Sequence, residues 1–201
     1  MILAENCNNL FGKCIEQYHI IDSIDQPFEN PIQERGIENL LYDKCWIDTV
    51  QWHYEDLIRD PEIDPVEGMA LKRLIDASNQ RRTDMVEQID DWFLEEFGGI
   101  DADQSATVNT ESPAWVVDRL SILALKIYHM QEQAERDNVD DSHVKQVQAK
   151  LAVLLEQQSD LSTSFDQLLD DIGSGRRKMK VYRQMKLYND PATNPVLYKN
   201  K

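Results

Sequence analysis

The sequence predicts an all-α protein: a single-domain multi-helix bundle of about five long helices, followed by an extended basic C-terminal tail. Apolar residues recur at the three-and-four spacing of a helical face along most of the 201 residues. Seven glycines and seven prolines are few for the many tight turns of an all-β protein. A hydrophobic content of 41% is too high for a disordered chain. The composition therefore predicts a helical core.

The first two helices are predicted on either side of a proline-containing break. The first covers residues 3–18, where Leu3, Phe11 and Tyr18 share one face. The break follows at residues 26–31. The second helix should run from near Gly36 to residue 60, because the residue before Pro61 is pushed out of the helical region.

The third helix has the clearest start and end signals. Asp64 is a predicted N-cap, Pro65 takes the first helical position, and Glu67 supplies an acid at the third. One apolar face then continues from residue 66 to residue 97, and the glycine pair at residues 98–99 predicts the end. Such a helix would be roughly 48 Å long.

Two further helices complete the predicted bundle. The fourth should open at Ser112 and Pro113 by the same cap logic and be the central, most buried helix, since residues 114–130 are apolar on most sides. The fifth should run from near Asp140 to Gly173 with an apolar stripe repeating every 3.5 residues. An antiparallel partner in the same bundle explains the stripe, and so does a second copy. We favour the former, which leaves a monomer or a homodimer open.

Charge divides the chain into two predicted parts, an acidic helical bundle (residues 1–175) and a basic C-terminal segment (residues 176–201). The segment holds eight bases and one acid, a net charge of +7, whereas the rest holds 13 bases and 36 acids, a net charge of −23. An acidic body repels nucleic acids and anionic membranes, so neither is an expected partner. The segment is expected to pack on the bundle by charge attraction and through its apolar residues, namely Tyr182, Met185, Leu187, Tyr188, Leu197 and Tyr198. Residues 181–188 fit either a helix or a strand, and from residue 189 onward an extended chain is expected.

The expected compartment is the cytoplasm. The first residues lack the basic region of a secretion signal. The longest apolar stretch, residues 116–130, carries three charged residues and is unsuited to span a membrane. Three cysteines cannot all pair and form no CxxC, which is typical of reduced, buried thiols.

Polar residues occur on helix faces that should be buried. Asp48, Glu55 and Arg59 share a narrow sector of the second helix, and two rows of polar residues follow the fourth helix. Buried charges are costly unless paired, so Asp118 and Glu55 are expected to face Arg82, Arg119 or Lys126 from adjacent helices. The candidate polar pocket consists of Asp48, Glu55, Arg59, Arg82, Asp118, Arg119, Lys126 and His129.

Several interpretations of these polar residues stay open. They can form an ion-pair network that fixes helix register, or line a ligand pocket between helices. A third interpretation places magnesium at Glu87 and Asp90 with Glu55 or Asp56, as in all-helical nucleotide pyrophosphohydrolases, although their first ExxE motif is missing. The scattered histidines and cysteines lack zinc spacing, so His53 and His129 are interpreted as packing or surface residues. No metal and no cofactor is expected.

A second candidate site precedes the fourth helix. Asn109, Thr110 and Ser112 place amide and hydroxyl groups beside the backbone N–H groups of a helix start. This arrangement predicts a candidate anion site, although we favour the alternative of a well-capped helix whose loop packs on the bundle.

Long motifs link the chain to a known family. They comprise residues 52–61 (WHYEDLIRDP), 71–84 (LKRLIDASNQRRTD), 109–115 (NTESPAW) continuing through 118–121 to 126–130, and 188–191 (YNDP) with Asn194 and Pro195. The sequence resembles a family of uncharacterised bacterial all-helical proteins, a domain of unknown function, along nearly its whole length. The resemblance implies a single all-helical domain but brings no reaction, cofactor or catalytic residue. It also suggests a genomic context near sugar-transferase genes of envelope glycan synthesis.

The functional expectation is a cytosolic helical interaction or ligand-binding module. Its partner would be an unknown protein or a small anionic ligand. The alternative is an enzyme acting on a phosphorylated or sugar-nucleotide substrate in the interhelical pocket. Glu55 and Asp118 would then serve as acid and base, and Arg82 and Arg119 would hold the anion.

Overall fold

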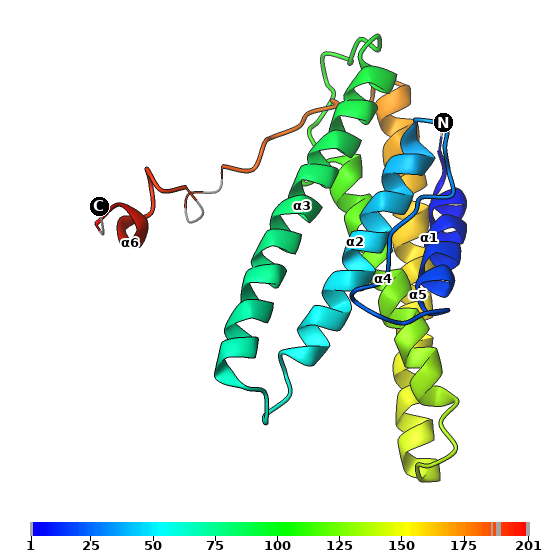
Figure 1. The fold of residues 1–201 in the computed structure, drawn as a ribbon. Coiled ribbons are helices and arrows are strands. Elements are labelled where there is room, and N and C mark those ends of the chain that lie inside the picture. The colour runs from blue at the N-terminus through cyan, green and yellow to red at the C-terminus, as the bar shows by residue number, and fades with distance from the viewer. Residues whose placement is uncertain (1, 186, 188–189, 200–201) are drawn as a thin grey trace.

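The computed structural model describes residues 2–185, 187 and 190–199 and confirms the predicted all-α fold. It forms one domain whose helices are α1 (Ala4–Tyr18), α2 (Ile37–Leu57), α3 (Pro65–Phe97), α4 (Pro113–Ala134), α5 (Asp141–Gly173) and the short α6 (Pro195–Tyr198) (Figure 1). Within the described residues the β structure is confined to one isolated bridge between Thr107 and Arg177.

The long helices form two antiparallel hairpins, and α1 packs against both of them. Figure 1 shows α2 paired with α3, and α4 paired with α5, with the two hairpins diverging towards the lower end of the view. α4 contacts α1, α2, α3 and α5, as expected for the most buried helix. The apolar stripe of α5 packs on α4, so it has a partner within the chain.

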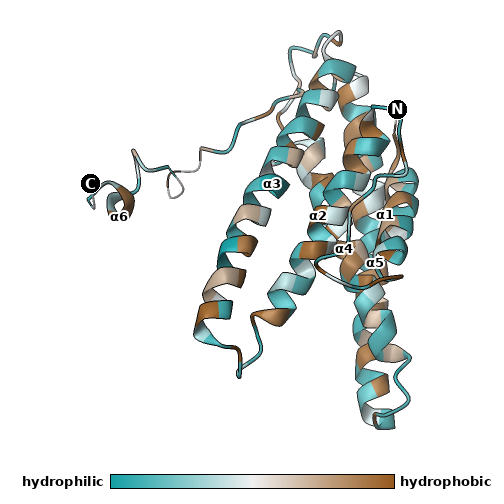
Figure 2. Cartoon of the chain, in the orientation of Figure 1, coloured by the Kyte–Doolittle hydropathy of each residue, from teal (hydrophilic) through white to brown (hydrophobic). Residues whose placement is uncertain are grey.

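The core lies where the hairpins and α1 converge. Helix α1 contributes residues that are fully buried, among them Cys7, Phe11, Cys14 and Tyr18. A smaller apolar cluster of Tyr54, Leu71 and Ile75 joins the far ends of α2 and α3, where Figure 2 shows hydrophobic residues on both helices.

Most helix ends match their sequence signals, and two differ. Asp64 caps α3 by accepting hydrogen bonds from the backbone N–H groups of Val66 (2.9 Å) and Glu67 (3.2 Å). Helix α2 ends at Leu57, three residues before the predicted end, because the chain tightens into i→i+3 hydrogen bonds there. Ser112 precedes α4 as predicted, but its side chain makes no capping hydrogen bond.

The basic segment contacts the bundle over its first residues and then leaves it (Figure 1). Arg176 and Arg177 pair with Asp171 at 2.8 and 3.1 Å, and further along the chain Arg183 pairs with Asp91 of α3. The expected apolar packing is not seen for Tyr182, Met185, Leu187, Leu197 and Tyr198, all of which are exposed, and Tyr188 lies outside the described residues. The segment beyond residue 189 includes α6, which starts after Asn194 caps it, rather than being extended throughout.

Candidate functional site

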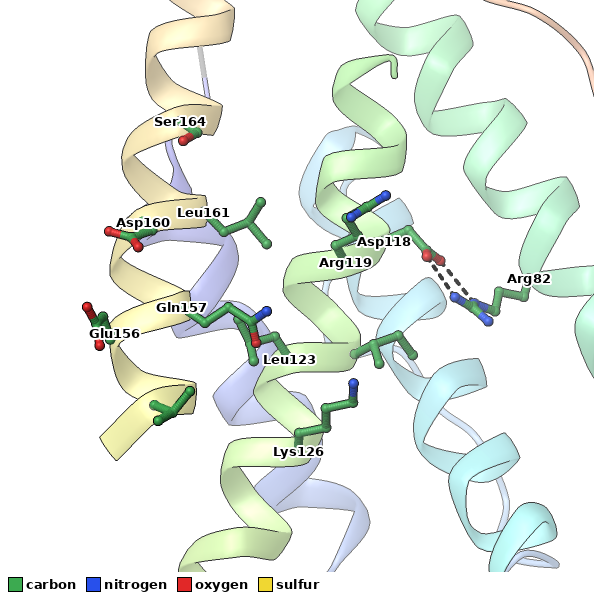
Figure 3. A pocket seen from close by; sticks show the side chains of 12 residues that line it. Arg82, Asp118, Arg119, Leu123, Lys126, Glu156, Gln157, Asp160, Leu161 and Ser164 are labelled. Carbon is green, nitrogen blue, oxygen red and sulfur yellow. Dashed lines mark hydrogen bonds and ion pairs between the residues drawn. The ribbon is translucent and has the colours of Figure 1, made fainter. Parts of the chain in front are cut away.

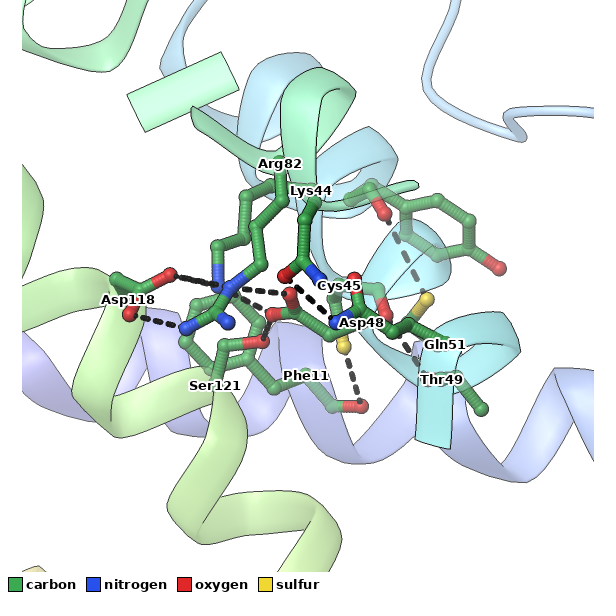
Figure 4. Close-up of polar contacts among 12 residues, drawn as sticks. Phe11, Lys44, Cys45, Asp48, Thr49, Gln51, Arg82, Asp118 and Ser121 are labelled. Carbon is green, nitrogen blue, oxygen red and sulfur yellow. Dashed lines mark hydrogen bonds and ion pairs between the residues drawn. The ribbon is translucent and has the colours of Figure 1, made fainter. Parts of the chain in front are cut away.

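A network of four charged side chains lies buried between α2, α3 and α4 (Figure 4). Lys44 is fully buried and pairs with Asp48 on the next turn of α2 and with Asp118 of α4 at 2.8 Å. Arg82 of α3 donates two hydrogen bonds to Asp118, from Nε (3.0 Å) and Nη2 (2.6 Å), and its Nε lies 3.2 Å from Asp48. Ser121 Oγ donates to Asp48 at 2.6 Å. Two positive and two negative charges thus cancel, as buried charges require.

The two carboxylates of this network have different electrostatic environments. Burial raises the pKa of Asp48, against the opposing effect of Lys44. Burial also acts to raise the pKa of Asp118, but the charges and hydrogen bonds of Lys44 and Arg82 outweigh it, so its pKa is lowered. Asp118 is therefore held ionised at neutral pH.

An open cleft of about 650 Å³ lies above the network, between α3, α4 and α5. The bidentate pair of Arg82 and Asp118 lines it between α3 and α4, and Figure 3 shows Arg119 and Lys126 projecting from α4. The remaining lining residues are Ile122 and Leu123 of α4, and Val153, Glu156, Gln157, Asp160, Leu161 and Ser164 of α5. The Arg82 side chain is 27% exposed and that of Asp118 is 7% exposed, so this pair faces solvent mainly through the guanidinium.

A second cavity of about 330 Å³ shares Arg82 and Ile122 with this cleft. Asp48, Glu55 and Arg59 of α2 line it, together with Gln51, Trp52 and Asp56. Glu55 pairs with Arg59 at 3.1 Å on the solvent side, and both side chains are substantially exposed. The two cavities together contain seven of the eight residues of the predicted polar pocket.

The pairing within that pocket differs from the expectation at several residues. The expected pair of Asp118 and Arg82 is present, but Glu55 does not join the buried network. Arg119 does not join it either, because it is 61% exposed and pairs with Glu111 at 2.6 Å. His129 does not line either cavity and stacks on Trp52 with ring centroids 4.9 Å apart.

Lys44, the most deeply buried cation of the network, is not among the residues predicted from the sequence. Its signal was present, because Lys44 precedes Asp48 by one turn and lies in the same polar sector of α2. Ser121 was missed as well. A serine inside an apolar helix has no distinguishing sequence context.

The candidate anion residues Asn109, Thr110 and Ser112 do share a pocket of about 390 Å³. Within this pocket, two groups of the protein already form hydrogen bonds with Asn109. Asn109 donates to the backbone oxygen of Glu111 at 3.0 Å and accepts from Arg177 at 3.3 Å. Burial raises the pKa of Asp90, against a smaller opposing effect of Ser112. Of the three candidate residues, Asn109 is the one whose side chain is engaged in hydrogen bonds with the described part of the chain.

The magnesium interpretation is contradicted by the geometry. Gln51 of α2 bonds Asn79 of α3 at 2.8 Å, so Glu87 lies about 12 Å farther along α3, away from the end of α2 that carries Glu55. Glu87 instead accepts a hydrogen bond from the backbone of Gln184. Within the described part of the chain, Glu87 and Asp90 belong to no group of three potential metal ligands.

No helix in the described part of the chain is both long enough and apolar enough to cross a membrane. A comparison with curated proteins finds no match, and a comparison with solved structures finds none either. The model of the family described as "Protein of unknown function (DUF4254)" matches residues 38–181. This range carries α3 to α5 and all but the first residue of α2, with the buried network and the cleft. The chain therefore belongs to this family, whose function is unknown.

Proposed function

We propose that the protein is a ligand-binding module that takes a small anionic molecule in the cleft between α3, α4 and α5. The cations that line the cleft carry the proposal. Arg82 and Lys44 neutralise Asp118, so this carboxylate does not repel an incoming anion. The other two carboxylates of the lining, Glu156 and Asp160, belong to α5. Arg119 and Lys126 project from α4 with exposed side chains.

The dimensions and lining of the cleft suit a small organic anion. Its volume lies in the range of small-molecule sites. Arg119 and Lys126 are seven residues apart on α4, a distance of about 10 Å along the helix. Leu123 and Leu161 offer apolar contacts, and Gln157 offers hydrogen bonds. A molecule with a phosphate or carboxylate group and a neutral body fits this lining.

Acid–base catalysis in the cleft has less support than binding. Asp118 is committed to two cations and has a lowered pKa, which makes it a poor proton donor and a weak base. Glu55 pairs with Arg59 and lines the smaller cavity. Glu55 and Asp118, the carboxylates of the enzyme alternative, therefore line different cavities and do not lie on either side of one substrate position.

A cytoplasmic location and a soluble small-molecule partner accompany this proposal. Cys7, Cys14 and Cys45 are unpaired and buried, which suits a reducing compartment. The exposed cations that line the cleft, Arg119 and Lys126, form its rim. This rim, rather than the acidic exterior, supplies the contacts for the ligand.

Titration calorimetry with pyrophosphate and a set of sugar phosphates tests the proposal. We expect binding by the unaltered protein and at least tenfold weaker binding by Arg119→Gln/Lys126→Gln. The exposed pair of Arg119 and Glu111 contributes little to folding, so this variant should remain folded. Lys13→Gln/Lys145→Gln changes the net charge equally outside the cleft and should bind normally. Equally weakened binding in both double variants would refute the cleft as the site. Absence of binding by the unaltered protein would refute it as well.

A further inference from the structure

Three of the four histidines of the chain meet at one place, although they lie far apart in the sequence. His19 follows the last turn of α1, His53 belongs to α2, and His129 belongs to α4. One ring nitrogen of each lies within 4.8 Å of the others. We propose that His19, His53 and His129 bind a divalent transition metal of the zinc class.

The separation of the ring nitrogens suits such a metal. The Nε2 atoms of His19 and His53 are 3.3 Å apart. Two ligands at about 2.05 Å from a tetrahedral zinc ion lie about 3.3 Å from each other, so this pair already has the required spacing. The ligand atom of His129 lies within 4.8 Å of both.

The outer ring nitrogens fix the orientation of two of the imidazoles. His19 Nδ1 lies 2.7 Å from the backbone oxygen of Ile15, and His129 Nδ1 lies 2.8 Å from the Glu132 carboxylate. Both partners accept hydrogen bonds, so Nδ1 carries the proton in each neutral ring and Nε2 presents its lone pair inward. Metal-binding histidines commonly use this second hydrogen bond for the same purpose.

The inward nitrogens lack enough hydrogen-bond donors of their own. A proton on His53 Nε2 can satisfy His19 Nε2, but it leaves His129 Nε2 with its lone pair. This atom is buried and has no hydrogen-bond partner among the described residues. A cation at the meeting point satisfies all three nitrogens at once.

Aromatic rings hold the three imidazoles in place. Tyr128 stacks on His19 (centroids 4.4 Å apart), Tyr18 on His53 (4.9 Å) and Trp52 on His129 (4.9 Å). Each imidazole thus has a ring partner of its own, as an ordered ligand shell requires.

Asp22 supplies a candidate fourth ligand from the solvent side. Its Oδ1 lies 3.7 Å from His53 Nε2 and 4.0 Å from His19 Nε2. Its backbone adopts the left-handed conformation (φ 54°), which turns the chain back over the end of α1. Three imidazoles and one carboxylate or water favour zinc over magnesium or calcium, which prefer oxygen ligands.

Zinc titration of the full-length chain, without added histidines and in competition with a chromophoric chelator, tests this proposal. We expect one zinc ion per chain, at least tenfold weaker binding by His129→Gln, and no competition from magnesium. His143→Gln, which removes the one histidine outside the cluster, should bind as the unaltered protein does. Cobalt should give the intense visible absorption of a tetrahedral site in the unaltered protein and lose it in His129→Gln.

A milder variant keeps the test decisive if His129→Gln fails to fold. Glu132 is exposed, so Glu132→Gln should fold and weaken zinc binding about tenfold through the His129 ring. Absence of zinc binding, or equal weakening in His143→Gln and the cluster variants, would overturn the proposal.

Discussion

Lys44 shows how one buried cation sets the electrostatics of the whole site. It is fully buried and contacts both carboxylates of the network, so its charge has no access to solvent. Its loss would leave Asp48, which is 2% exposed, with Arg82 as its remaining cation. A buried charge without sufficient compensation is strongly destabilising.

We therefore expect Lys44→Met to lower the free energy of unfolding by about 3–5 kcal/mol, as measured by urea denaturation. Lys126→Met makes the same chemical change on the exposed rim of the cleft and should change it by about 0.5 kcal/mol or less. A loss below about 1 kcal/mol for Lys44→Met would show that the network is solvated rather than buried.

The cluster of His19, His53 and His129 could not be predicted from the sequence. Spacing motifs detect metal ligands within one segment, whereas these three histidines lie 34 and 76 residues apart on separate helices. Helical periodicity places each of them on a face, but the packing of α1, α2 and α4 decides that the faces meet.

At the scale of the helices, the sequence predicted most of the residues at which the helices begin and end. Asp64 with Pro65, and Asp140 at the start of α5, act as the caps that their residue types indicate. Ser112 has the same local pattern, yet its side chain makes no capping hydrogen bond. The end of α2 was misplaced because a tightened final turn has no distinct sequence signal.

This contrast predicts different costs for two cap substitutions. Asp64→Ala should lower the free energy of unfolding by about 1 kcal/mol, because two backbone N–H groups of α3 lose their acceptor. Ser112→Ala should have almost no cost, since its side chain makes no capping hydrogen bond. Thermal unfolding of both variants measures the difference, and equal losses would contradict the assigned cap roles.

Helix α1 makes the fold sensitive to alkali. Burial raises the pKa of Cys7 and of Tyr18 to about 12 each, with smaller contributions from Asp166 and Asp22 respectively. The folded state therefore retains these protons at a pH where the unfolded chain releases them. The stability from both groups is fully present below about pH 8.5 and is lost as the pH rises towards 12.

Urea denaturation between pH 8 and pH 11 should show a steady fall in the free energy of unfolding. Cys7→Ala removes one of the two groups and should flatten this fall, even if the variant is less stable throughout. An unchanged slope in Cys7→Ala would show that the Cys7 thiol ionises with equal ease in both states.

At the scale of the whole molecule, helix packing determines which charged residues are buried and which are exposed. The four charges of the network lie where α2, α3 and α4 converge, and the cations of α4 lie where the hairpins leave an open cleft. Seven of the eight residues that the sequence predicted for the polar pocket do line the two cavities, because polar positions on apolar helices are visible as a pattern. It could not assign Arg119 to the rim and Lys44 to the interior, since burial depends on how far the two hairpins diverge.

The basic segment shows the same dependence on packing. Charge attraction holds Arg176, Arg177 and Arg183 on acidic residues of α3 and α5. The apolar side chains farther along find no groove on the bundle and stay exposed. Composition alone indicates affinity between the two parts but not the extent of their contact.

We infer that the buried network stabilises the fold and that Arg119 and Lys126, which line the cleft, bind an anion. Urea denaturation of the unaltered protein with and without pyrophosphate tests it most directly, because a ligand bound to the folded state raises the unfolding midpoint. We predict a rise for the unaltered protein and Lys13→Gln/Lys145→Gln and no rise for Arg119→Gln/Lys126→Gln. An equal rise in all three proteins, or a rise in none, would contradict the account.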